Sequence, residues 1–228
     1  MARPPSRRAS STEISRFLGT SKAISAVNQR RPRLLFAIDA TASRQPTWDT
    51  ACHIQQQMFQ AVNREVTLSV QLCYYRGLHE FYASPWLYDS NALAQQMARV
   101  YCEGGHTQIA RLLRHILSEH QRNSLRAAVF IGDAIEEQSE TLCQLAGQCG
   151  LRKVPLFLFQ EGHNPQVQQI FQRMAKLSGG AWARFDAASA DVLAELLKAV
   201  AGFVTGGRRA LKNNPSEGAK LLLQQLKP

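Results

Sequence analysis

Three short segments of the sequence carry oxygen-bearing side chains that a suitable fold would bring to one point. The segment from Asp39 to Ser43 reads Asp-Ala-Thr-Ala-Ser and places one carboxylate and two hydroxyl groups at alternate positions. Thr107 follows a Gly-Gly-His loop, and Asp133 follows an apolar run. None of these side chains offers sulfur or nitrogen. Because hard oxygen ligands favour Mg²⁺, Mn²⁺ or Ca²⁺ over zinc, the segments predict a divalent-cation site, with Mg²⁺ as the first candidate.

The elements that must position these segments alternate between strands and helices. Apolar runs predict strands over residues 34–38, 66–75, 79–83, 127–131, 154–159 and 182–185. Helical spacing and capping residues predict helices over residues 46–63, 90–101, 107–120, 136–148, 165–177 and 188–204. The second and third strands are close enough to form a hairpin around Gly77.

This alternation predicts an α/β fold, with a doubly wound, mostly parallel six-stranded sheet and helices on both of its faces. In such folds the functional site lies at the carboxyl ends of the strands. Asp39 and Asp133 both come directly after predicted strands. The two carboxylates are therefore expected at the same edge of the sheet.

The formal net charge of +10 is concentrated in the two ends of the 228-residue chain. Residues 1–33 contain eight basic residues and one acidic residue, and residues 201–228 contain five and one. We predict a basic flexible extension over residues 1–32 with a short helix at 12–27, one domain over 33–205, and a basic tail over 206–228 with a short helix at 217–226. Basic tails are compatible with binding to nucleic acid, acidic lipid or an acidic protein.

The cysteine and hydropathy patterns indicate a cytoplasmic protein. The five cysteines form no Cys-x-x-Cys pair, which favours free thiols in a reducing compartment. The longest apolar runs have six residues, whereas a membrane span needs ~20. We expect no secretory signal, because no apolar stretch of ~7–15 residues follows the basic start.

The order Asp-x-Thr-x-Ser, then Thr, then Asp resembles the metal-ion-dependent adhesion site of von Willebrand factor A (VWA) domains, in the form found in cytoplasmic bacterial proteins. All five positions are occupied here, by Asp39, Thr41, Ser43, Thr107 and Asp133. The resemblance covers about residues 33–204. It implies that the three hydroxyl groups bind the ion, that the two carboxylates bind it directly or through water, and that a Glu or Asp of a protein partner completes the shell. Thr41 replaces the usual serine, and Ala134 stands where glycine is frequent.

Four residues near these positions are candidates for contacting the partner: Arg44, His106, Glu136 and Glu137. Arg44 has the charge and geometry to pair with a carboxylate of the partner. His106 either touches the ligand or closes its own loop. The two glutamates either extend an acidic rim or stabilise the dipole at the start of their own helix.

The resemblance implies a non-enzymatic module that binds a partner's carboxylate through a metal ion in a cytoplasmic assembly. One alternative is a metal-dependent phosphoryl-transfer hydrolase, since such sites also combine two carboxylates with a metal at strand ends. Those sites need a second Asp where this sequence has Thr41, and neither a phosphate-binding P-loop nor a nucleophile elbow is present. The other alternative is nucleic-acid binding through the basic tails. Only Phe17 and Phe203 are available there for stacking on bases, which argues against a single-strand platform.

Overall fold

The computed structural model describes residues 16, 31–44, 68–186 and 190–226. The compact unit that contains the sheet runs from Pro32 to Pro228. Apart from Arg16, the predicted helix at 12–27 lies outside the described residues, and so does the predicted helix at 46–63. No described helix is long and apolar enough to cross a membrane.

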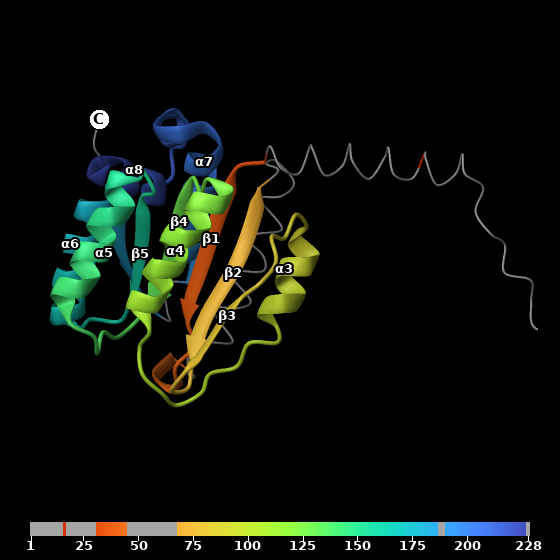
Figure 1. The fold of residues 1–228 in the computed structure, drawn as a ribbon. Coiled ribbons are helices and arrows are strands. Elements are labelled where there is room, and N and C mark those ends of the chain that lie inside the picture. Colours follow the sequence, from red (N-terminus) through yellow and green to blue (C-terminus); the bar gives the residue numbers. More distant parts are fainter. Residues whose placement is uncertain (1–15, 17–30, 45–67, 187–189, 227–228) are drawn as a thin grey trace, which may run out of the picture. The chain divides into compact units, whose positions relative to one another are not determined.

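Six strands form one sheet in the order β3-β2-β1-β4-β5-β6 (Figure 1). They are β1 (Arg33–Asp39), β2 (Ser69–Arg76), β3 (Glu80–Ala83), β4 (Ala127–Gly132), β5 (Leu156–Glu161) and β6 (Ala181–Phe185). All neighbouring strands are parallel except β2 and β3, which form the predicted hairpin. Gly77 makes its turn with a positive φ of 56°, a conformation that glycine adopts without strain. The predicted doubly wound, mostly parallel sheet is confirmed.

Polar side chains cap the amino ends of three of the described helices. The helices are η1 (Ala42–Arg44, a 3₁₀ turn), α3 (Ser90–Met97), α4 (Ile109–Asn123), α5 (Ser139–Leu151), α6 (Pro165–Ser178), α7 (Ala190–Asn213) and α8 (Glu217–Gln225). The side chains of Asp89, Asn164 and Ser216 accept hydrogen bonds from backbone N–H groups in the first turns of α3, α6 and α8. Such caps satisfy N–H groups that have no partner inside the helix.

The side chains of β1 alternate between two hydrophobic cores. Leu34, Phe36 and Ile38 pack on one face with residues from α3, α7 and α8. Leu35 and Ala37 pack on the other face with residues from α4, α5 and α6. Because successive side chains of a strand point to opposite faces, a continuous apolar run such as β1 requires helices on both sides. Figure 1 shows α4, α5 and α6 together over one face.

The carboxyl-terminal segment differs from the predicted basic tail. We expected the last helix of the domain to stop before Gly206 and residues 206–228 to form a basic tail with a short helix at 217–226. Instead α7 continues to Asn213 across a kink at Gly207, and α8 follows it. Leu211, Leu222 and Leu226 are buried in the core. The apolar side chains of this segment cover the sheet, while its basic side chains lie mostly at the surface, so the domain extends well beyond residue 205.

Candidate metal centre

Asp39 ends β1 near the middle of the sheet, and its side chain is completely buried. Its Oδ1 accepts a hydrogen bond of 2.8 Å from the backbone N–H of Thr41. Its Oδ2 accepts one of 2.9 Å from the hydroxyl group of Tyr75, which is directly paired with Asp39 in the register of β1 and β2. Donors from two elements therefore fix the orientation of this carboxylate.

The pKa of Asp39 is raised, because burial penalises the charged form of its carboxyl group. The negative charge of Asp133 raises the pKa further, and the hydrogen bonds from Thr41 and Tyr75 only partly offset these effects. A buried carboxylate with a like charge beside it is costly to keep ionised unless a positive charge compensates it. The electrostatics of this position favour a bound cation.

Asp133 follows β4, which pairs in parallel with β1, and its Oδ1 is buried with no hydrogen-bond partner among the described residues. A buried acceptor without a partner is unusual in folded proteins, because it loses its hydration without replacement. A cation bound between the two carboxylates would supply the missing interaction.

The hydroxyl groups of Thr41 and Ser43 lie together just beyond the end of β1. Their oxygen atoms are 3.2 Å apart. Thr41 is buried and Ser43 is exposed, so this pair extends from the interior to the surface. Two hydroxyl oxygens in this place are ordinary ligands for a hard divalent cation.

Thr107 is joined to the loop of Asp133 by a reciprocal pair of hydrogen bonds with Glu136. The backbone N–H of Glu136 donates to Oγ1 of Thr107 over 3.0 Å, and the backbone N–H of Thr107 donates to Oε2 of Glu136 over 2.8 Å. The carboxyl group of Glu137 accepts from the backbone N–H groups of Ile109 and Ala110. These contacts tie the start of α4 to the loop after β4.

The two glutamates explain why α5 begins at Ser139 rather than at the predicted residue 136. They lie in the loop before α5, and Glu137 caps α4 instead of stabilising its own helix. The side chain of Gln108, at the N-cap position of α4, makes no capping hydrogen bond to the backbone of that helix, so the carboxylate from the neighbouring loop takes over this role. Of the four candidate partner-contacting residues, Glu136 and Glu137 are thus both held by intramolecular contacts. The side chains of His106 and Glu136, whose Nδ1 and Oε2 lie 3.2 Å apart, are still 71% and 48% exposed.

Arg44 lies inside the protein and not at the surface, where a residue that contacts a partner would lie. Its side chain is buried, and its Nε donates a 2.7 Å hydrogen bond to Oε2 of Glu161 at the end of β5. Its Nη1 donates to the carbonyl oxygen of Asp39 over 3.3 Å. The expectation that Arg44 contacts a partner is corrected: this residue anchors η1 to the carboxyl ends of β1 and β5.

Sequence reasoning missed Tyr75, Glu103 and Glu161 at this edge of the sheet. Glu103 follows α3, donates its backbone N–H to the carbonyl oxygen of Ala40 and forms a parallel bridge with Thr41. The available signal was positional, because Tyr75 and Glu161 lie at or next to the ends of strands parallel to β1. Parallel strands bring their carboxyl ends to one edge, so polar residues there were candidates for contact with Asp39 or its loop.

The donor set of this edge fits a hard cation held largely by hydroxyl groups. In the part of the chain that the structure describes, no three side chains of His, Cys, Asp or Glu cluster as a metal site. In a metal site at this edge, the carboxylates of Asp39 and Asp133 would supply charge, and the hydroxyl groups of Thr41, Ser43 and Thr107 would supply neutral oxygen. This chemistry matches Mg²⁺, Mn²⁺ or Ca²⁺.

Comparison with solved structures identifies the fold as that of VWA domains. A von Willebrand factor type A protein from Catenulispora acidiphila is 16% identical, with a TM-score of 0.61 over 75% of this chain and 43% of that chain. The vWF domain of the type V pilus tip protein Mfa5 from Porphyromonas gingivalis is 10% identical, with a TM-score of 0.60 over 78% and 96%. The manganese-loaded TRAP protein of Plasmodium vivax is 14% identical, with a TM-score of 0.54 over 75% and 74%.

The present chain therefore spans less than half the length of the Catenulispora protein. Neither a protein-family model nor a curated protein matches its sequence.

Proposed function

We propose that this chain is a protein–protein interaction module whose site holds a divalent cation and binds an Asp or Glu of a partner protein. The ligands would be Asp39, Thr41, Ser43, Thr107 and Asp133, and the ion Mg²⁺, with Mn²⁺ or Ca²⁺ as alternatives. The observation that carries the proposal is the buried Oδ1 of Asp133, which has no hydrogen-bond partner within the described part of the chain, together with the buried carboxyl group of Asp39, which its charge affects. The manganese-loaded TRAP structure, which shares the fold, adds support.

The residues around the site would hold the ligands in place. Tyr75 and the backbone N–H of Thr41 orient the carboxylate of Asp39. Arg44 and Glu161 fix η1 against β5. When bound, the ion supplies the positive charge that attracts the partner's carboxylate.

Two half-exposed carboxyl groups lie near the site, and each has a basic neighbour. Glu103 is 52% exposed and its Oε2 lies 3.8 Å from Nε of Arg76, and Glu136 is 48% exposed and its Oε2 lies 3.2 Å from Nδ1 of His106. A bound cation would add positive charge beside these groups and would attract the carboxylate of a partner.

Binding rather than catalysis is proposed because of the residue at position 41. A phosphoryl-transfer site of the kind considered above requires an Asp two residues after Asp39 as acid and base. The side chain at that position is the hydroxyl group of Thr41, which contacts Ser43. A hydroxyl group of ordinary acidity is a metal ligand here and not a general base.

Thermal unfolding of the full chain tests the metal site. Wild type, Asp39→Ala and the control Asp191→Asn, an exposed acidic residue at the start of α7, are compared in Mg²⁺, Mn²⁺ and EDTA. A ligand that binds only the native state stabilises it by about 2.7 kcal/mol at a hundredfold excess over Kd. We expect a concentration-dependent rise in Tm that Asp39→Ala abolishes and the control retains. No rise in wild type at millimolar metal would overturn the proposal.

Partner binding is tested separately with the immobilised chain. Proteins retained in Mg²⁺ should elute with EDTA and should not be retained by Asp39→Ala. Retention that persists in EDTA would contradict recognition of a carboxylate through the ion, even if the metal itself is bound.

A further inference from the structure

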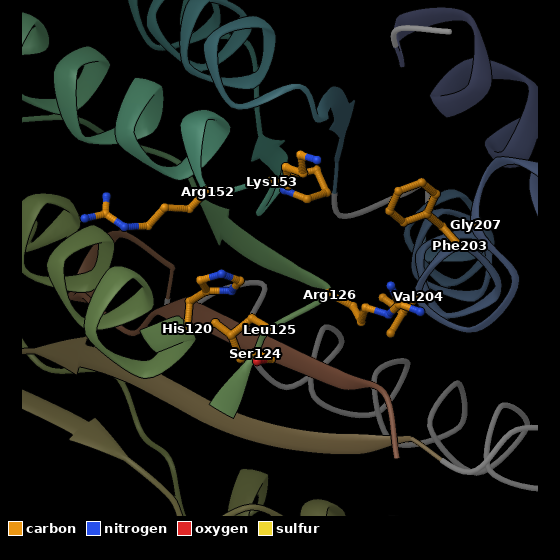
Figure 2. Close-up of a pocket in the computed structure, with 10 residues that line it drawn as sticks. His120, Ser124, Leu125, Arg126, Arg152, Lys153, Phe203, Val204 and Gly207 are labelled. Atoms are coloured by element: carbon orange, nitrogen blue, oxygen red, sulfur yellow. The ribbon is translucent and has the colours of Figure 1, made fainter. Parts of the chain in front are cut away.

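A second candidate site lies at the opposite edge of the sheet from Asp39. A cavity of about 450 Å³ opens at the amino ends of β4 and β5, between the ends of α4 and α5 and the kink of α7. Its lining includes His120, Ser124, Arg126, Lys153, Phe203 and Val204, and we call it the basal cavity (Figure 2). The length of β4 separates it from Asp133 by roughly 20 Å, at ~3.3 Å per residue.

The basal cavity is basic and, among the described residues, has no acidic residue in its lining. Figure 2 shows His120, Lys153 and Arg126 at three separate positions around the cavity, with Arg126 beside Val204. The guanidinium group of Arg152 extends away from these three residues. Nδ1 of His120 is buried without a hydrogen-bond partner among the described residues. Basic side chains around one cavity, with no acidic residue in its described lining, form an anion-binding environment.

The backbone around the cavity is strained at two of the residues that line it. Within the described part of the chain, Ser124 and Lys153 are the two non-glycine residues with positive φ, at 52° and 59°. Both follow a helix, at a position that usually carries glycine because the left-handed conformation is unfavourable for other residues. At the end of α6 the same chain does use glycine, Gly179 with a φ of 73°. The strained positions thus coincide with side chains that line the cavity.

Helix dipoles account for only part of this arrangement. Basic residues are favoured near the carboxyl ends of α4 and α5 on electrostatic grounds alone. That preference does not require a left-handed backbone. It also does not account for the imidazole of His120, whose buried Nδ1 has no hydrogen-bond partner in the segments that the structure describes. Strain and unpaired donors concentrate at binding sites.

The remaining wall of the cavity is apolar and suits a ring. Phe203 and Val204 lie across from His120, with Lys153 between His120 and Phe203 in this view (Figure 2), and Pro155 also contributes to the lining. A volume of this size falls in the range of small-molecule sites, ~300–1,000 Å³. We propose that the basal cavity binds an organic phosphate of mononucleotide size, with its phosphate on Lys153, Arg126 and His120 and its ring against Phe203.

Calorimetric titration of the full chain with AMP, inorganic phosphate and adenosine tests the proposal. We expect saturable binding of AMP with one site per chain, weaker binding of phosphate and none of adenosine. Lys153→Gly and Arg126→Gln should each weaken AMP binding about tenfold or more, since each removes a charge-assisted hydrogen bond. The control is Lys176→Gln, an exposed lysine in the last turn of α6, and it should leave the affinity unchanged.

Lys153→Gly separates binding from folding, because glycine relieves the left-handed strain at that position. Its Tm should equal or exceed that of the wild type while AMP affinity falls. A lowered Tm together with unchanged affinity would overturn the inference. So would an absence of AMP and phosphate binding at millimolar concentration, an equal loss in Lys176→Gln, or binding of a single-stranded oligonucleotide that AMP does not displace.

Discussion

The hydroxyl group of Tyr75 donates a 2.9 Å hydrogen bond to Oδ2 of Asp39 across two directly paired parallel strands. Both side chains are buried. Burial and the negative charge of Asp39 raise the pKa of Tyr75 well above its ordinary value, so the phenol remains a neutral donor. The orientation of the central carboxylate thus depends on a residue that the sequence motif does not contain.

Tyr75→Phe should lower the free energy of unfolding by about 1.5–3 kcal/mol, because it removes a hydrogen bond to a charged acceptor and leaves Oδ2 without its donor. Urea unfolding in EDTA measures this change. The matched control is Tyr82→Phe, whose hydroxyl group bonds Gln96 over 3.2 Å in a half-buried position, and whose loss should cost less than ~1 kcal/mol. Equal effects of the two substitutions would show that the contact with Asp39 has no special role.

Asp133→Asn should separate stability from metal binding. Burial is the main cause of the raised pKa of Asp39, and the substitution removes the charge that raises it further, so the metal-free protein should be unchanged in stability or more stable, by up to about 1 kcal/mol. The rise in Tm with Mg²⁺ should be lost, because the ion loses one of its two carboxylates. Thermal unfolding in EDTA and in Mg²⁺ checks both parts, and a retained response to Mg²⁺ would exclude Asp133 as a ligand.

The buried pair of Arg44 and Glu161 should behave as a unit in a double-mutant cycle. Glu161→Met should cost about 3–5 kcal/mol, since it leaves the Arg44 guanidinium buried without its carboxylate. Arg44→Met combined with Glu161→Met should recover much of that loss. The exposed pair of Arg173 and Glu140, 3.1 Å apart, is the control and should contribute less than ~1 kcal/mol. Free energies of unfolding are measured in urea. If the losses caused by the two single substitutions add up to the loss of the double variant, Arg44 and Glu161 are not coupled and the prediction is wrong.

The lowered pKa of His115 predicts that the free energy of unfolding depends on pH near neutrality. Burial lowers its pKa, the carboxylate of Glu119 opposes this shift, and the charge of Arg122 adds to it. Its Nε2 lies 3.0 Å from Oε1 of Gln71. Because the unfolded chain takes up the proton first as the pH falls below ~6.5, the contribution of His115 is full above that pH and is lost as the pH falls through the folded pKa.

His115→Gln should therefore flatten the slope of unfolding free energy against pH between about 7.5 and 5. Urea unfolding at several pH values checks the difference between variant and wild type. The exposed His163→Gln serves as the reference, and an identical slope in all three proteins would refute the assignment.

The packing of α8 predicts that alanine substitutions at two adjacent leucines lower the free energy of unfolding by very different amounts. Leu222 is completely buried, whereas Leu221 is 41% exposed. Leu222→Ala should lower the free energy of unfolding by about 2–5 kcal/mol, because it leaves a cavity in the core. Leu221→Ala should cost about 0.5 kcal/mol or less. Similar small costs at both positions would indicate a segment that does not belong to the core.

The sheet was predictable because its signals are local. The run from Leu34 to Ile38 has to be buried on both faces, and such a run is typical of a central parallel strand. The order of the five candidate ligands from Asp39 to Asp133 was readable from residue types at and after the ends of strands, and their binding of a metal stays a prediction. The helix at 217–225 was anticipated from its own pattern, but its place in the core was not, because burial depends on whether another surface is left uncovered.

Residue types and periodicity were thus enough for the fold class and for five candidate metal ligands. Only the tertiary structure decided that Arg44 is buried against Glu161, that Glu137 caps a helix other than its own, and that Tyr75 holds Asp39. Each of these contacts joins residues between 27 and 117 positions apart in the chain. A side chain's partner in space depends on the register and packing of whole elements, and local sequence does not encode that relationship.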